Sequence, residues 1–206
     1  APAIEKPETT VTVEEEVIEL PEGFGEGFDL GITEETSDEL IGVDGVKLGV
    51  EELFESNPEL ANIGTPEQYS QYLDSIFPDS KVKDIVYHGS EFKNIENFKT
   101  TSDGIFFTPD RFAAERYSKM TFSGIPGETY LVLLNIQKSK DLGSVGYEDL
   151  YKAKEKYSET YDSVYSNDVM EPGIQESQIV VFKPEQIHIL GSKQDIEGFK
   201  GFVNKP

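Results

Sequence analysis

Hydrophobic residues recur at helical spacing in the first part of the compact region. Over residues 50–60 and 65–76, apolar side chains return every three or four positions, which predicts two helices. Thr65, Pro66 and Glu67 form a typical helix start, because they supply a capping hydroxyl, a proline at the first helical position and an acid in the first turn. Further helices are predicted over residues 111–119, 147–159 and 195–203.

Short apolar runs between these helices predict strands. The run TYLVLLNI at residues 129–136 lacks alternation, which indicates a strand buried on both faces. Several short strands mixed with helices favour an α+β fold over a regular βαβ repeat. The other predicted strands cover residues 84–90, 104–108, 162–165, 177–183 and 187–190.

The pattern differs in residues 1–48, where apolar residues are scattered among Pro, Gly, Thr and Glu. Such a segment buries too little apolar surface to offset its chain entropy, so we expect an acidic, largely extended or disordered extension. Residues 49–206 are expected to form the folded domain. No basic stretch followed by an apolar core opens the chain, which predicts no signal peptide, and the first residue, Ala1, indicates a processed product or a fragment.

Charge and composition narrow the function. The 206 residues carry 18 basic and 40 acidic side chains, a formal net charge of −22, which disfavours nucleic acid as a partner and favours a basic one. There is no cysteine, and the two histidines have no ligand-type spacing to carboxylates, which predicts no metal site. No stretch reaches the roughly 18–20 apolar residues of a membrane helix. We expect a soluble chain that acts in the cytoplasm or is delivered into a host cell or virion.

The two histidines differ in their surroundings. His88 ends an apolar strand and is followed by Gly89 and Ser90. A strand end is where a side chain reaches a cleft, and a glycine there lets a ligand approach the backbone. A histidine that only caps a turn is the alternative. His188 lies between two isoleucines, so strand alternation predicts that it faces solvent.

Two further pairs of residues are candidates for a site. Phe106 lies on a predicted strand and Tyr117 on the helix that follows, where two alanines leave room beside the tyrosine. Two rings held by separate elements can sandwich a flat heterocycle, and two core rings are the alternative. Glu176 and Gln178 precede an apolar strand and share one of its faces, where they either reach a cleft or form an exposed loop end.

Taken in order, these segments resemble one family. The strand VYHGS, the strand and helix GIFFTPDRFAAERY, and the closing pair IVVFKPEQIHIL resemble the diphtheria-toxin-type (His-Tyr-Glu) group of the ADP-ribosyltransferase superfamily. Over residues 62–203 the chain is most similar to the transferase-like domains of phage and mobile-element polyproteins. The resemblance implies two small antiparallel sheets packed at a steep angle around an NAD cleft, with an N-terminal helical segment before them.

The resemblance also implies roles for individual residues. His88 would hydrogen-bond the ribose of NAD, the Gly89 backbone would hold the nicotinamide amide, and Ser90 would support the turn. Phe106 and Tyr117 would flank the nicotinamide ring. The implied function is mono-ADP-ribosyl transfer, in which NAD is cleaved at the nicotinamide–ribose bond and ADP-ribose passes to an acceptor such as a protein.

The chain departs from this family at the catalytic glutamate, which aligns with Gln178. Glutamine carries no charge to stabilise a cationic transition state. Glu176 is then the working carboxylate, or the enzyme is slow, or the chain is an inactive binding or structural module, for instance in a phage virion. The acidic loop at 165–175 favours a basic acceptor. A phosphotransferase is disfavoured, because the only arginines, Arg111 and Arg116, lie on one predicted helix.

Overall fold

The computed structural model describes residues 45–121, 124–169 and 176–205, and these form a mixed α+β structure, as predicted. The helices are α1 (Val50–Ser56), α2 (Pro58–Ala61), α3 (Pro66–Ile76), α4 (Arg111–Lys119), α5 (Tyr147–Tyr151), α6 (Ala153–Tyr157) and α7 (Lys193–Val203). The strands are β1 (Val86–Ser90), β2 (Ile105–Phe107), β3 (Glu128–Leu134), β4 (Ser139–Asp141), β5 (Ser144–Val145), β6 (Ser163–Ser166), β7 (Asp168–Val169), β8 (Gln178–Val181) and β9 (Ile187–Ile189).

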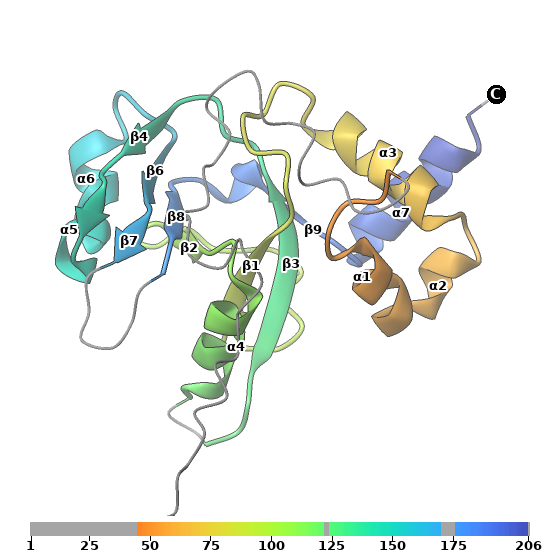
Figure 1. Ribbon diagram of the computed structural model, residues 1–206, viewed down its shortest axis with the longest axis horizontal. Coiled ribbons are helices and arrows are strands. Elements are labelled where there is room, and N and C mark those ends of the chain that lie inside the picture. The colour runs from red at the N-terminus through yellow and green to blue at the C-terminus, as the bar shows by residue number, and fades with distance from the viewer. Residues whose placement is uncertain (1–44, 122–123, 170–175, 206) are drawn as a thin grey trace, which may run out of the picture.

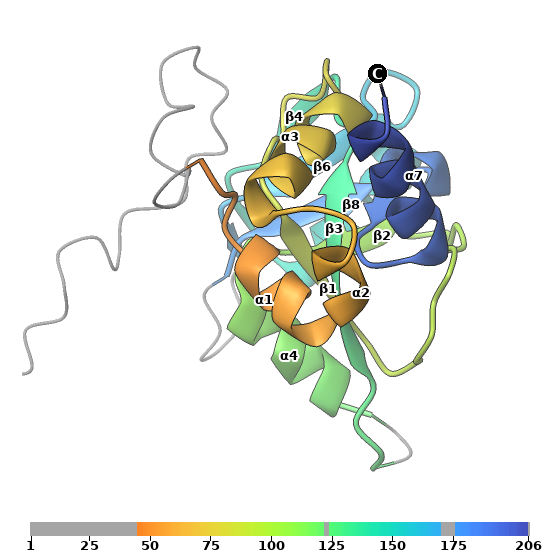
Figure 2. The same cartoon turned by 90° about the vertical axis from the view of Figure 1, so that its right-hand side faces the viewer.

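An antiparallel sheet with the order β1-β3-β9 lies in the middle of the molecule (Figure 1). Leu131 and Leu133 of β3 pack against α1, α2, α3 and α7, which Figure 2 shows grouped on one side of the sheet. Val132 and Leu134 pack into the core shared with the second sheet. The two-sided burial predicted for this strand is therefore confirmed, and it accounts for the missing alternation.

The second sheet has the order β2-β8-β6-β4. Ile179 and Val181 of β8 belong to the core shared with the first sheet, whereas Val180 packs against α5 and α6. The expectation of two antiparallel sheets is wrong for β4, which pairs with β6 in parallel, and the short pair β5-β7 is also parallel. The helices α5 and α6 form a crossover between β4 and β6, so the chain enters both strands from the same end.

The two sheets meet beside the candidate site. Tyr87 of β1 and Thr108, which follows β2, form an antiparallel bridge. The distance from the backbone nitrogen of Tyr87 to the carbonyl oxygen of Thr108 is 2.8 Å, and the reciprocal distance is 2.9 Å. His88 is the next residue along β1, and Phe106 lies two residues before Thr108. This bridge therefore fixes the spacing between the strand that carries the histidine and the strand that carries the phenylalanine.

The helix starts follow the sequence signals. Thr65 caps α3: its hydroxyl accepts the N–H of Gln68, and the Gln68 side chain accepts the N–H of Thr65 at 3.0 Å. The helix predicted over residues 50–60 is divided into α1 and α2, because Pro58 has no N–H with which to continue α1. Pro58 instead occupies the first position of α2, where that N–H is not needed.

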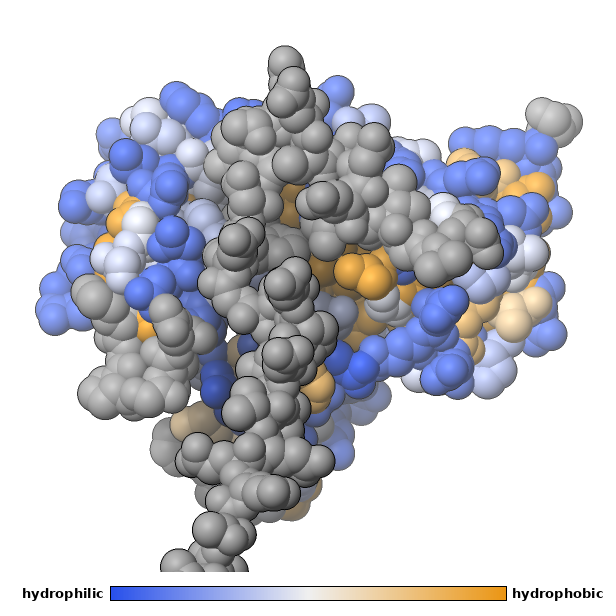
Figure 3. Space-filling model, viewed as in Figure 1, coloured by the Kyte–Doolittle hydropathy of each residue, from blue (hydrophilic) through white to orange (hydrophobic). Residues whose placement is uncertain are grey.

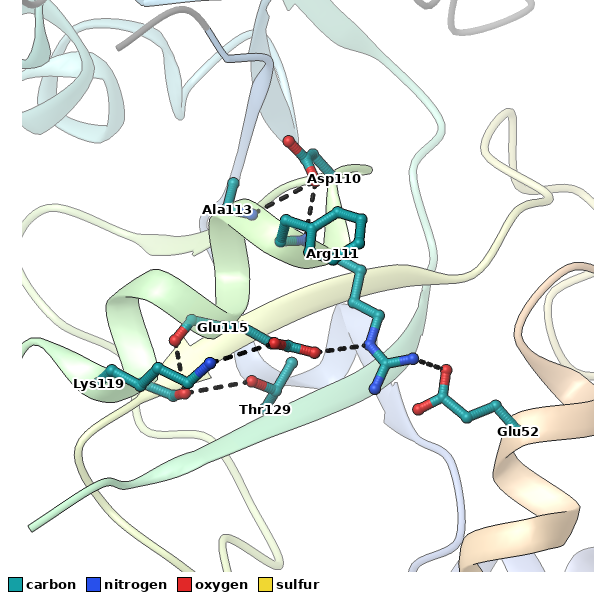
Figure 4. Close-up of polar contacts among 9 residues, drawn as sticks. Glu52, Asp110, Arg111, Ala113, Glu115, Lys119 and Thr129 are labelled. Carbon is teal, nitrogen blue, oxygen red and sulfur yellow. Dashed lines mark hydrogen bonds and ion pairs between the residues drawn. The ribbon is translucent and has the colours of Figure 1, made fainter. Parts of the chain in front are cut away.

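Helix α4 is fixed at its start and along its side. The carboxylate of Asp110 accepts two backbone N–H groups of the first turn. Figure 4 shows the Arg111 side chain extended between Glu115 of the same helix and Glu52 of α1, and its guanidinium donates to both carboxylates. These ion pairs connect the helical layer to α4, which borders the candidate site.

The described surface is mainly hydrophilic on the face drawn in Figure 3. None of the helices in the described ranges is long and apolar enough to cross a bilayer. Residues 1–44 of the expected extension lie outside the described residues, so its extended state stays a prediction. Val46, from the end of the expected extension, is buried among the residues of α1 and α3.

Candidate active site

A pocket of about 200 Å³ lies where β1, β2, β8, α4 and α5 come together. Five of the seven residues predicted for the site line it, namely His88, Gly89, Phe106, Tyr117 and Gln178. They come from four separate elements, so the fold gathers positions that are up to 90 residues apart in the chain. The pocket is smaller than the roughly 300–1,000 Å³ that encloses a drug-sized ligand, so it suits one end of a larger molecule.

His88 presents a neutral acceptor to this pocket. Its Nδ1 lies 2.7 Å from the carbonyl oxygen of Phe106, and a carbonyl oxygen only accepts, so Nδ1 carries the proton. Burial lowers the pKa of His88, although the hydrogen bond to Phe106 acts in the opposite direction. The ring of Phe98 packs edge-on against the imidazole with centroids 4.8 Å apart. The ring is thus held neutral and oriented, with Nε2 able to accept a hydrogen bond.

Stability should depend on pH through this histidine. The folded-state pKa lies below the ordinary value of about 6.5, so below that pH the unfolded chain binds the proton more readily than the folded one. The contribution is complete above about pH 6.5 and is lost as the pH falls. Urea unfolding from about pH 7.5 to about pH 5.5 should show a steeper loss for the native chain than for His88→Asn. Equal slopes would contradict the assignment.

Gly89 is required by helix packing. A Cβ at this position would lie 1.9 Å from the carbonyl oxygen of Ala114 in α4. The sequence interpretation attributed this glycine to ligand access, and the structure adds a second reason, because no side chain fits between β1 and α4. Ser90, outside the pocket lining, accepts the N–H of Phe92 on its hydroxyl and so braces the turn after β1.

Aromatic rings form much of the pocket wall, and α5 contributes two that the sequence interpretation missed. Tyr147 and Tyr151 stack with centroids 5.9 Å apart, and Tyr151 meets Phe106 edge-on at 5.5 Å. Tyr117 reaches the same place from α4, where its hydroxyl contacts that of Tyr147. The available signal was the spacing of four residues between the two tyrosines on a predicted helix, which places both on one helical face.

Glu176 is buried directly behind the pocket lining, so the alternative of an exposed loop end is wrong for it. Its side chain is 1% exposed and accepts four hydrogen bonds. Arg116 donates to Oε2 at 2.6 Å, and Oε1 accepts from the hydroxyls of Tyr117 and Tyr147 at 2.5 Å and from the amide nitrogen of Gln178 at 2.7 Å. The carboxylate therefore organises the side chains that face the pocket.

The two tyrosines act as donors to this carboxylate. Burial raises the pKa of Tyr117 and Tyr147, and their hydrogen bonds to Glu176 raise it further. Both hydroxyls therefore keep their protons at neutral pH. Neither is suited to act as a general base in its present surroundings.

The charge of the pocket selects the class of ligand. Among the described residues, neither lysine nor arginine belongs to its lining. Arg111 and Arg116 lie outside the described lining, and their guanidinium groups pair with carboxylates. Within the described ranges no three His, Cys, Asp or Glu side chains gather to hold a metal ion. Aromatic walls and neutral acceptors suit a flat or cationic ring that carries hydrogen-bond donors.

The prediction that His188 faces solvent is wrong. Its side chain is 11% exposed, and its Nε2 lies 2.7 Å from Oδ1 of Asp195. Alternation assumed that one face of β9 is open, but α7 and α3 cover the face toward which His188 points. The same buried carboxylate accepts from the hydroxyl of Tyr69 at 2.5 Å and the N–H of Gly191 at 2.8 Å. This network joins α3, β9 and α7 and does not reach the pocket.

Comparisons of the sequence with protein families and with curated proteins identify no relative from which a function can be inferred. No protein-family model matches the chain, and no curated protein matches it.

Proposed function

We propose that the protein is a mono-ADP-ribosyltransferase that uses NAD as its substrate, on an ADP-ribosyltransferase-like fold. The observation that carries this proposal is the convergence of His88, Phe106, Tyr117 and Gln178 in one pocket between two sheets. These are the positions that the sequence resemblance implies for binding nicotinamide and its ribose. The nearby buried carboxylate of Glu176 adds the negative charge that such chemistry uses.

The nicotinamide riboside end of NAD fits the chemistry of the lining. The nicotinamide ring of NAD is flat and positively charged, and the faces of Phe106 and Tyr117 attract such a ring. The ribose carries hydroxyl donors, and Nε2 of His88 is a neutral acceptor for one of them. The diphosphate and adenosine then extend out of the pocket, whose described lining has no cationic side chain to hold them.

The transfer step places positive charge on the ribose. The bond between C1′ and the nicotinamide nitrogen breaks, and its electron pair leaves with neutral nicotinamide. The acceptor's nucleophilic atom bonds to C1′ and gives up its proton to solvent. Glu176, one hydrogen bond behind Gln178, acts on this charge through the Gln178 amide, whose oxygen faces the ribose. Loss of one such stabiliser costs about 3 kcal/mol, or about a hundredfold in rate.

A second function is favoured by a specific observation. The carboxylate of Glu176 is occupied by four donors, and the position of the family's glutamate is filled by Gln178. A chain with these features would bind NAD without turning it over, as an inactive module of a larger assembly such as a phage particle. The transferase and the inactive module share the pocket and differ in turnover.

The test follows nicotinamide release and NAD binding in the full chain. We expect His88→Ala to lower the release rate about a hundredfold, because the ribose loses its acceptor. Met120→Ala is the control, since Met120 is exposed and lies outside the pocket lining. Binding without release in the native chain would favour the inactive module. A native chain that neither binds NAD nor releases nicotinamide would overturn the proposal.

The acceptor is proposed to be a basic protein. Of the acidic loop at 165–175, residues 165–169 are described and 170–175 lie outside the described residues. Asp168 accepts a hydrogen bond from Ser144 at 2.9 Å on an exposed part of the surface. The support for a basic acceptor is thus the net charge of −22 and this local acidity.

A further inference from the structure

The side-chain amide of Gln178 has a fixed orientation. Gln178 is 3% exposed, lines the pocket, and has its Nε2 2.7 Å from Oε1 of Glu176. An ionised carboxylate only accepts hydrogen bonds, so the NH₂ group of the amide must face Glu176. The amide oxygen then lies on the other side of the group. Among the described residues, no donor reaches this oxygen.

The partner that sets this orientation is itself immobilised. Arg116 holds Oε2 of Glu176 at 2.6 Å, and Tyr117 and Tyr147 both donate to Oε1 at 2.5 Å. These donors come from α4 and α5, on separate parts of the chain. The carboxylate therefore cannot turn to follow the amide, whereas the amide can turn to follow the carboxylate.

We infer that Glu176 is a positioning residue that acts through Gln178, directing the amide oxygen into the pocket. The pocket then presents two neutral acceptors, Nε2 of His88 and Oε1 of Gln178. Two acceptors beside aromatic walls select a ligand with a flat ring joined to a group bearing neighbouring hydroxyls, which is a ribosyl group. This selection rests on the proposed function, whereas the orientation of the amide does not.

With Glu176 at this distance, a glutamate is not expected to fit at position 178 in its ionised form. In Gln178→Glu, two carboxylates would lie within hydrogen-bond distance in a buried place. One of them would have to bind a proton, because like charges so close cannot both ionise. Restoring the family's residue therefore does not restore an ionised pair, and the present glutamine is the residue that fits beside Glu176.

The orientation is tested first without any ligand. In the ¹⁵N-labelled full chain, the side-chain NH₂ resonances of Gln178 should show one strongly hydrogen-bonded, slowly exchanging proton. The Gln178→Ala variant assigns them by their disappearance. Glu176→Gln should remove that signature, because the amide loses its charged acceptor. The amide of Gln186, which donates to the carbonyls of Asn135 and Asp162, is the internal control and should not change. An unchanged Gln178 signal would overturn the inference.

The selection is tested by binding. Glu176→Gln should weaken NAD binding about tenfold and leave 1-methylnicotinamide, which has the charged ring without ribose, within about twofold. In a Gln178→Ala background the same substitution should change NAD binding by less than about twofold. Equal losses for both probes, or additive losses in the double variant, would overturn the positioning role.

The binding measurement and the amide spectrum separate the failure of this inference from the failure of the proposed function. A native chain that does not bind NAD ends the proposed function, while the amide spectrum still decides the orientation. Where Glu176→Gln fails to fold by circular dichroism, Glu176→Asp replaces it. This variant keeps the charge, shortens the reach by one methylene, and should also shift the Gln178 resonances and weaken NAD more than 1-methylnicotinamide.

Discussion

Replacing Asp195 with alanine is expected to lower the free energy of unfolding by about 3–5 kcal/mol, because it removes a fully buried carboxylate and leaves its partners unpaired. The donors are the hydroxyl of Tyr69 at 2.5 Å, Nε2 of His188 at 2.7 Å and the N–H of Gly191 at 2.8 Å. Asp195 is fully buried, so water does not replace its carboxylate in the variant. Urea unfolding followed by circular dichroism measures the loss.

A nearby control separates the network from the helix start. Ser192 caps α7 through the N–H of Asp195, so Ser192→Ala should cost only about 1 kcal/mol. Asp195→Asn keeps the shape but places an NH₂ group among donors, so its loss should fall between those of the two alanine variants. A loss below about 1 kcal/mol for Asp195→Ala would show that the network is not important for stability.

Replacing Gly89 with alanine is expected to cost about 3 kcal/mol and to remove the proposed NAD binding as well. The new methyl group would lie 1.9 Å from the carbonyl oxygen of Ala114 and 2.8 Å from Cβ of Tyr117. The first contact is with helix backbone, so α4 as a whole must move away from β1. That movement withdraws Tyr117 from the pocket. Urea unfolding and calorimetric titration with NAD measure the two effects.

Gly201 provides the matched control. It lies inside α7, and a Cβ there would meet no atom within 4 Å. Gly201→Ala should therefore raise stability by about 0.5–1 kcal/mol, since alanine loses less backbone entropy in a helix. A Gly89→Ala variant as stable as the native chain would mean that α4 packs against β1 more loosely than the structure shows.

Local signals in the sequence predicted the elements that depend on neighbours in the chain. Thr65 marks the start of α3, because capping involves residues only three positions away. The division at Pro58 could have been predicted in the same way. The strands β4, β5 and β7 were missed, because they are two or three residues long and their pairing comes from distant partners.

The candidate site also contains residues that local signals predict and residues that only distant contacts place. His88, Phe106 and Tyr117 were predicted because each follows a strand or helix signal in its own segment. Tyr147 was missed, since its place beside Glu176 depends on the crossover through α5. The burial of Glu176 could not be read from a loop-like segment either, because burial there is created by donors from α4 and α5. No local sequence pattern predicts these contacts between α4, α5 and Glu176.

The strand β3 has a consequence for how the molecule unfolds. Its alternate residues contribute to two hydrophobic cores, one shared with the helical layer and one shared with the second sheet. An intermediate that lost either layer would expose one whole face of this strand to water. Such a species is too costly to accumulate, and the described domain should melt as one cooperative unit. In a calorimeter, the heat absorbed would then match the enthalpy obtained from the temperature dependence of the unfolding equilibrium.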